Sequence, residues 1–351
     1  MRLVWLGGYT QDIPMASGEI VPGRSKGIAC CALDEETGRL ELLNVTEDAV
    51  NPSYLAVRGN VLCCANELET VGGVPGSTVS AYVIEGTQLR LLGRRMAAGP
   101  LACHAVFSPD GRHVLAASYN GGVCVLPLGE ELEDMSCSLR FQGSGPDLNR
   151  QEGPHPHQIL IHPNGKQVYV CDLGADRIRR FRADWKRGWL TPDGELCTQP
   201  GQGPRHGTFD ASGQRLYVLT ELSGEIDVFD VETGTLIQVL PAMPEGLQGP
   251  AMGAAVRMHP SGRFLYTSLR GPSLIAVFPV REDGGLETPA FYPSGGKTPR
   301  DFCITPDGRY LLSGGQDDCS VCVHAVNPET GALRQVWHME DAGSVTTVAV
   351  L

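Results

Sequence analysis

The sequence has no apolar stretch that approaches the ~18 residues of a membrane-spanning helix, and no long stretch with amphipathic-helix spacing. We therefore expect no membrane anchor. Positive charge is also scarce, because 28 lysines and arginines stand against 40 aspartates and glutamates and give a net charge of −12. This balance argues against nucleic-acid binding through bulk charge. The first residues predict a strand instead of a secretory leader, so we expect a cytoplasmic protein.

Common catalytic and metal-binding motifs are missing as well. The chain contains no HExxH sequence, no acidic metal-binding loop and no GxSxG turn around a nucleophilic serine. Cys319 and Cys322 form a CxxC pair, but a zinc site would need a second convergent pair. Most of the twelve cysteines lie in apolar runs, where reduced cysteine behaves as a small buried hydrophobe. We predict a reduced protein that uses no metal and no cofactor.

What the chain does contain is a repeated unit. The stretch from Gly153 to Arg177 predicts a strand at residues 159–161, a tight turn at 163–165 and a second strand at 168–170. The same turn recurs roughly every 50 residues, which is typical of repeat architectures. Its glycines are Gly111, Gly165, Gly213, Gly262 and Gly308, with a weaker copy at Gly59.

The two chain ends complete the count of units. A third apolar run follows the hairpin in each unit, and seven such runs can be found, from residue 28 to residue 333. Residues 344–351 predict a first strand with no turn after it, and residues 2–10 predict a second strand with no first strand before it. We therefore predict an all-β fold, a seven-bladed β-propeller in which N- and C-terminal strands close the last blade. We expect residues 1–351 to form a single domain.

The predicted fold gathers polar groups at one end of a central channel. In a propeller, the innermost strands begin at the same mouth where the second strands end. Because guanidinium groups bind carboxylate or phosphate in a bidentate manner, this mouth predicts a site for a small anionic molecule. The alternative is that these groups pair with one another and close the channel. The candidates are His104, His155, His157, Arg205, Arg257 and Arg300 near strand starts, and Glu67, Asp172, Glu221, Arg270 and Gln316 near strand ends.

Several motifs in order resemble one known family. These motifs are GPHPHQ, DLGADRI, GPRH, TEL, HPSGRFLYTSLRG and TPRDFCITPDGRYLL. Together they resemble the lactonases with a seven-bladed propeller, which include the propeller type of 6-phosphogluconolactonase and a fungal carboxymuconate cycloisomerase. The resemblance runs from Gly8 to the C-terminus. Two departures concern the pocket wall, because Leu269 and Gly315 stand where the family commonly has asparagine.

The resemblance implies cofactor-independent lactone chemistry at the channel mouth. By motif, the proposed catalytic groups of the cycloisomerase branch fall on His157, Arg205, Glu221 and Arg270. His155 is a rival for the histidine role, and Arg257 is a rival for Arg270. The remaining candidates, which are His155, Arg300, Glu67, His104, Asp172 and Gln316, would then bind substrate.

The expected function is hydrolysis of a sugar-acid lactone, above all 6-phosphogluconolactone in the pentose phosphate pathway. His157 would activate water, and Arg205 and Arg270 would hold the substrate's anionic group and the developing oxyanion. Glu221 would orient one of these groups or act as the base. Two alternatives remain, a cycloisomerase acting on a muconate-type dicarboxylate and a non-catalytic interaction platform. We expect a small anionic substrate as the only partner of a monomer or weak homodimer.

Overall fold

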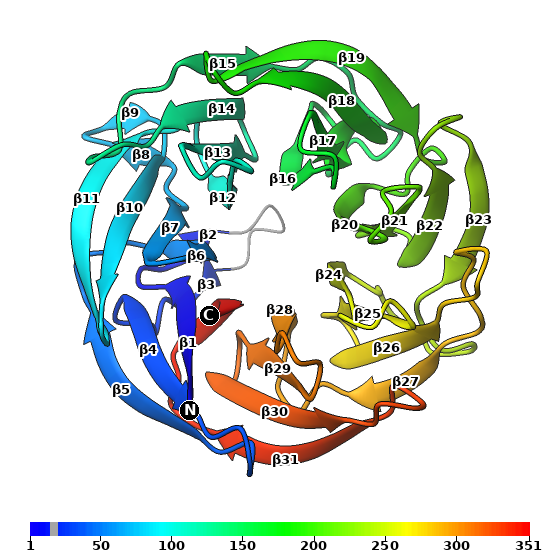
Figure 1. Cartoon of the computed structure of the whole chain (residues 1–351). Coiled ribbons are helices and arrows are strands. Elements are labelled where there is room, and N and C mark those ends of the chain that lie inside the picture. The colour runs from blue at the N-terminus through cyan, green and yellow to red at the C-terminus, as the bar shows by residue number, and fades with distance from the viewer. Residues whose placement is uncertain (15–19) are drawn as a thin grey trace.

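The computed structural model describes residues 1–14 and 20–351 and shows seven four-stranded antiparallel sheets around a central axis (Figure 1). The predicted all-β, seven-bladed propeller is confirmed. Five blades take their strands in chain order from the inside outwards. They are β12–β15 (Ala102–Phe107, His113–Ser118, Gly122–Pro127, Cys137–Arg140), β16–β19 (Pro156–Ile161, Gln167–Asp172, Arg177–Asp184, Trp189–Cys197), β20–β23 (Pro204–Phe209, Arg215–Thr220, Glu225–Asp230, Leu236–Pro241), β24–β27 (Gly253–Met258, Phe264–Leu269, Leu274–Pro279, Ala290–Pro293) and β28–β31 (Pro299–Ile304, Tyr310–Gly315, Ser320–Val326, Leu333–Met339).

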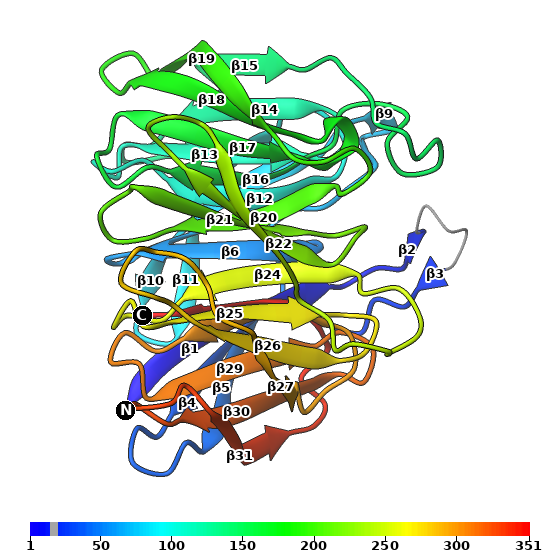
Figure 2. The same ribbon diagram turned by 90° about the vertical axis from the view of Figure 1, so that its right-hand side faces the viewer.

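The remaining elements complete the ring and decorate it. One further blade is made of β6 (Pro52–Arg58), β7 (Val61–Asn66), β10 (Thr78–Glu85) and β11 (Gln88–Met96). Two small hairpins are β2 (Ile13–Pro14) with β3 (Ile20–Val21), and β8 (Thr70–Val71) with β9 (Val74–Pro75). Figure 2 shows the β2–β3 hairpin projecting from one face of the ring. A 3₁₀ turn, η1 (Leu173–Ala175), follows β17, and no helix in the described residues is long and apolar enough to cross a membrane.

Strands from the two ends of the chain close the ring, as predicted. β32 (Ser344–Val350) is the inner strand of a blade whose other strands are β1 (Arg2–Tyr9), β4 (Ile28–Leu33) and β5 (Leu40–Thr46). Val4 pairs with Val350 and Tyr9 pairs with Ser344. The two ends of the chain thus complete the seventh blade, and the inner edges of all blades face the central channel, where another chain cannot easily pair with them.

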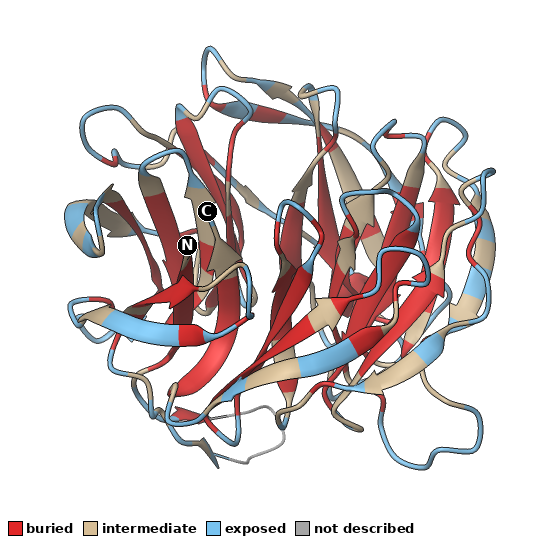
Figure 3. Cartoon of the chain, turned by 60° about the horizontal axis from the view of Figure 1, so that its bottom comes forward, coloured by how far each residue is buried: buried red, intermediate tan, exposed pale blue. Residues whose placement is uncertain are grey.

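The core lies between the blades, in the middle strands. Figure 3 shows buried residues along the inner and middle strands and exposed residues on the outermost strands. For example, all six residues of β13 are buried, whereas exposed residues recur along β11. In the described part of the chain, no cysteine forms a disulfide. The repeated apolar runs of the sequence therefore build a continuous core of packed blades.

Two turn histidines join neighbouring blades. The His162 Nε2 and Gly213 O atoms are 3.0 Å apart, and so are His259 Nε2 and Gly308 O. A Cβ atom added to Gly213 would lie 2.5 Å from His162 Nε2, and its φ of +75° is also unfavourable for other residues. The repeated turn glycine thus serves both the turn and the contact with the preceding blade.

Candidate active site

A repeated distortion of the inner strands places side chains at the mouth, the channel end where these strands begin. In six blades, the ladder between the inner and second strands skips one residue near this start. Such β-bulges re-aim a side chain and are common beside active sites. In four of these blades a proline precedes the skipped residue and withholds a ladder hydrogen bond. The skipped residues are Ser53, Cys103, His157, Arg205, Arg300 and Thr346.

Glu221 gathers three guanidinium groups at the mouth. Its Oε2 atom lies 2.8 Å from Arg205 Nε and 2.7 Å from Arg270 Nη2. Its Oε1 atom accepts a hydrogen bond from Arg150 Nη2. The side chains of Arg205, Arg270 and Glu221 are only 2%, 4% and 6% exposed. We call Glu221, Arg205, Arg270 and Arg150 the Glu221 cluster.

The cluster fixes the charge of Glu221. Burial by itself would raise the pKa of this carboxyl, but Arg270, Arg205 and Arg150 outweigh burial and hold the pKa well below its usual value. Glu221 is therefore ionised at neutral pH. A carboxylate engaged in this way serves as a counter-ion for buried arginines and is poorly suited to accept a proton.

His157 differs from the rest of the mouth because its ring is neutral and incompletely bonded. Burial and the charge of Arg205 lower its pKa well below the usual value, with Glu221 opposing the shift. Its Nδ1 atom is buried and has no hydrogen-bond partner within residues 1–14 and 20–351. A neutral imidazole can accept a proton from water. Because Nδ1 of His157 is buried, the proton would have to be accepted at Nε2.

His155 has a different environment. Its Nδ1 atom lies 3.2 Å from the carbonyl oxygen of Tyr119, and its Nε2 atom lies 3.1 Å from Glu152 Oε1. Its ring also stacks on Tyr119 at a centroid distance of 4.1 Å. Both ring nitrogens therefore have protein partners, and the structure distinguishes two histidines that the sequence could not.

Arg300 adds a further positive charge at the level of His157. Its guanidinium lies over the Tyr9 ring, 5.7 Å from the centroid. Among the described residues, no carboxylate forms an ion pair with it. Glu67 accepts a hydrogen bond from Tyr9 Oη at 3.2 Å, and its buried Oε2 atom has no partner in the part of the chain that the structure describes. Arg300 is thus positioned to hold an anion.

The other candidates lie at the margins of this group. Asp172 is fully buried and accepts hydrogen bonds from Arg179 Nε and the His155 backbone N–H, both at 2.8 Å, so it stabilises its own blade. Gln316 donates from Nε2 to Asp317 Oδ1 at 2.9 Å. The structure does not bring Asp172 into the Glu221 cluster.

Arg257 and His104 lie one level deeper in the channel. Arg257 pairs with Asp301 at 2.8 Å and donates to Tyr54 Oη at 3.2 Å. The His104 ring packs on Tyr54 with a centroid distance of 4.1 Å. Between the two arginine rivals, Arg270 therefore belongs to the Glu221 cluster and Arg257 does not.

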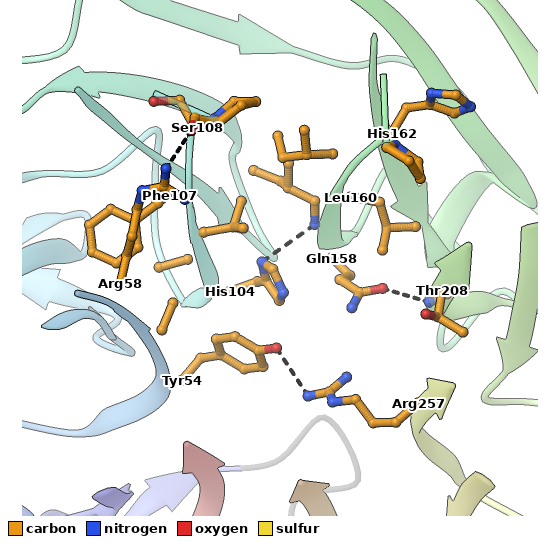
Figure 4. Close-up of a pocket in the computed structure, with 18 of the residues that line it drawn as sticks. Tyr54, Arg58, His104, Phe107, Ser108, Gln158, Leu160, His162, Thr208 and Arg257 are labelled. Atoms are coloured by element: carbon orange, nitrogen blue, oxygen red, sulfur yellow. Dashed lines mark hydrogen bonds between the residues drawn. The ribbon is translucent and has the colours of Figure 1, made fainter. Parts of the chain in front are cut away.

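A cavity of about 510 Å³ extends from this deeper level to the opposite face of the ring. Figure 4 shows Tyr54, His104, Gln158 and Arg257 at its polar end, with Ser108 and His162 at the other. Its walls are mostly apolar, and the Glu221 cluster does not line it. The cavity is therefore separate from the mouth, although the same inner strands line both.

Sequence reasoning missed Arg150, which lies outside the strands between β15 and β16. Its side chain is 31% exposed and reaches Glu221 from that connection. The only available signal was a basic residue in a polar stretch, since the repeat pattern places nothing there. In the described chain, no group of three or more His, Cys, Asp or Glu residues could hold a metal ion.

Comparisons with known proteins agree with this architecture. A family model described as "Lactonase, 7-bladed beta-propeller" matches residues 3–350. The 6-phosphogluconolactonase of Bacillus subtilis strain 168 is 31% identical over 328 residues, covering 90% of this chain and 92% of that protein. The 6-phosphogluconolactonase of Serratia proteamaculans is 32% identical over 307 residues, covering 85% and 88%. The periplasmic gluconolactonase PpgL of Pseudomonas aeruginosa has a TM-score of 0.89 at 26% identity, covering 100% and 99%.

Proposed function

Because the chain belongs to the lactonases with a seven-bladed β-propeller and is a lactone-hydrolysing enzyme, we propose that its substrate is 6-phosphogluconolactone and its product 6-phosphogluconate. The names of the relatives favour this reaction over the cycloisomerase and the interaction platform. The observation that carries the proposal is a positively charged mouth in a chain of net charge −12. Four arginines, Arg150, Arg205, Arg270 and Arg300, lie near only two buried carboxylates, Glu221 and Glu67.

Arg300 would hold the phosphate of this substrate. Its guanidinium lies at the level of His157 and has no ion-pair partner among the described residues, so the substrate phosphate would supply its counter-ion. Arg150 would assist from the outer side, because its side chain remains 31% exposed beside Glu221. A lactone whose phosphate is held there would present its ring to the deeper side chains of the mouth.

His157 would act as the general base. Its neutral ring would take a proton from a water molecule as the water oxygen attacks the carbonyl carbon of the lactone. Arg270 and Arg205 would stabilise the negative charge that develops on the carbonyl oxygen. Glu221 would hold both guanidiniums in place as their counter-ion. His155 would support the site by stacking on Tyr119.

We also propose a cytoplasmic enzyme of the pentose phosphate pathway. This placement depends on the substrate and on free cysteines, eleven of which are buried. The oligomeric form would be a monomer or a weak homodimer, since the site as described uses residues of one chain.

The test compares His157→Gln with the matched variant His155→Gln, using 6-phosphogluconolactone with a chelator present. The wild type should hydrolyse the lactone well above the spontaneous rate, and His157→Gln should lose about 100-fold or more in kcat. The His155→Gln protein should retain most of the activity. A wild-type rate equal to the spontaneous rate would refute the substrate, and equal losses in both variants would refute the assignment of the base.

A further inference from the structure

The cavity on the opposite face of the ring is large enough for a small molecule, at about 510 Å³. The His206 ring lies between this cavity and the mouth. It packs against the rings of Tyr54 and His104 on one side and His157 on the other, and it does not line the cavity. A molecule in the cavity would therefore not touch the Glu221 cluster. The residues at its inner end determine which ligand it can hold.

Two buried side chains present N–H groups at this inner end. His104 and Gln158 are 3% and 4% exposed, and both line the cavity. His104 Nδ1 accepts a hydrogen bond from the Ile159 backbone N–H at 3.4 Å, so the neutral ring carries its proton on Nε2. Gln158 Oε1 accepts from the Gly207 N–H, which leaves the amide nitrogen as donor. Within the described residues, neither donor nitrogen has a partner, and both remain in contact with solvent.

Tyr54 and Arg257 add donors beside them. Arg257 Nη2 donates to Tyr54 Oη at 3.2 Å and to Asp301 Oδ1 at 2.8 Å, and the Arg257 side chain remains 25% exposed. Because Tyr54 Oη accepts from Arg257, its own proton can be donated to a ligand. Asp301 does not line the cavity, and its Oδ2 atom accepts hydrogen bonds from Thr347 and Val348. The inner end thus offers donors and keeps its carboxylate out of reach.

The charge distribution around the cavity favours an anion. In the part of the chain that the structure describes, no aspartate or glutamate lines it, whereas Arg58 and Arg257 both do. This is notable in a chain with 40 acidic residues. Burial, followed by the charges of Arg257 and Arg205, lowers the pKa of His104 well below its usual value, so its neutral ring lies in a positive environment. Donors gathered in such an environment suit an anionic oxygen.

The walls beyond the inner end have a different character, because they are mostly apolar. They include Leu55, Val106, Phe107, Leu160 and Val256. An apolar surface of this kind gains free energy when an apolar ligand replaces water against it. The cavity therefore combines a polar end for one head group with walls for an apolar body.

We propose that this cavity binds a small organic acid with one carboxylate and an apolar body (Figure 4). The carboxylate accepts hydrogen bonds from His104, Gln158 and Tyr54, and the body lies along the apolar walls. This inference goes beyond the proposed function and does not depend on it. A phosphorylated sugar acid lacks an apolar body, so the product of the proposed reaction is a poor ligand for this second site.

The test is calorimetric titration of the full chain with 3-phenylpropionate, which has a carboxylate head and an apolar body. We expect one molecule to bind per chain. The alcohol 3-phenylpropan-1-ol should bind about tenfold or more weakly, because it lacks the charge that strengthens the hydrogen bonds. Propionate should also bind more weakly, because it keeps the head group and loses most of the apolar contact.

Variants locate the bound acid. His104→Phe keeps a ring against Tyr54 and removes the Nε2 donor, so the Kd should rise about fivefold or more. Arg257→Met combined with Asp301→Asn removes the cation together with its counter-ion, so neither charge is left buried alone, and the Kd should rise about tenfold. Arg300→Met, at the mouth, is the matched control and should keep the wild-type Kd. Thermal unfolding identifies which variants are folded.

The outcomes distinguish this proposal from the proposed function. Equal affinity for the acid and the alcohol, or no binding of the acid, would refute the site. A wild-type Kd in the folded variants at the inner end would refute it too. Loss of binding in Arg300→Met would place the acid at the mouth and overturn the proposal. Hydrolysis of 6-phosphogluconolactone is measured separately, and its absence alongside intact binding of the acid would refute the proposed function alone.

Discussion

Replacing Glu221 by glutamine should destabilise the protein strongly, because two buried guanidiniums would lose their counter-ion. The side chains of Arg205 and Arg270 are 2% and 4% exposed, and both form ion pairs with the same carboxylate oxygen of Glu221. Removing one partner of a buried ion pair costs ~3–5 kcal/mol, since the remaining charge stays out of water. With an unfolding entropy of ~0.7 kcal/mol/K for 351 residues, the melting temperature should fall by about 4–7 °C.

The assay is thermal unfolding followed by circular dichroism at pH 7, with Glu41→Gln as the matched control. Glu41 forms an ion pair with Arg39 at 3.9 Å, but the two side chains are 65% and 60% exposed, so this change should leave the melting temperature unaltered. Because the folded pKa of Glu221 lies below its unfolded value, its stabilisation is lost as the pH falls through the folded pKa. The wild-type and Glu221→Gln curves should therefore converge in acid. Equal melting temperatures at pH 7 would refute this account of the cluster.

Two further changes test the charge distribution. Arg300→Met should raise KM for 6-phosphogluconolactone by about tenfold or more, because a charge-assisted hydrogen bond to phosphate is lost. KM for the unphosphorylated lactone should be unchanged. Steady-state kinetics with both lactones check this, and equal effects on both would contradict it. Asp227 is fully buried, and burial together with Glu225 raises its pKa to about 7, so its ionisation removes stability as the pH rises from about 4 to about 7. Asp227→Asn should therefore melt higher than wild type at pH 8 and show no gain at pH 4, whereas a gain of equal size at both values would exclude ionisation as the cause.

The fold could be read from the sequence because local and global signals agree. The repeated turn glycine, the apolar runs and the incomplete units at the two ends each indicate the same blade count. Proline at the start of β16 and β20 is a further local signal, since it precedes the bulge that places His157 and Arg205 at the mouth. Strand starts and ends alone therefore predicted where the candidate site residues on the strands lie.

The partners of these side chains could not be read in the same way. Arg270 pairs with Glu221, whereas Arg257 pairs with Asp301, and the register of β24, on which Arg257 lies, is irregular between Gly253 and Val256. The repeat pattern of the sequence does not reveal such a register shift. A slip of one residue is enough to move a side chain to the other face of its strand. Arg150 lies outside the repeat pattern altogether. The sequence also cannot show that both ring nitrogens of His206 are buried without a hydrogen-bond partner among the described residues, because this depends on every neighbouring side chain.

The charges at the mouth link substrate binding to the basicity of His157. Its pKa is lowered by burial first, then by Arg205, and further by Arg300 and Arg270, while Glu221 raises it. A substrate phosphate bound at Arg300 would offset part of that positive charge, so the pKa of His157 would rise towards neutrality when substrate is present. A base with a pKa near the working pH is the more effective one. The same arginines that would bind the substrate would thus keep His157 a weak base until the substrate arrives.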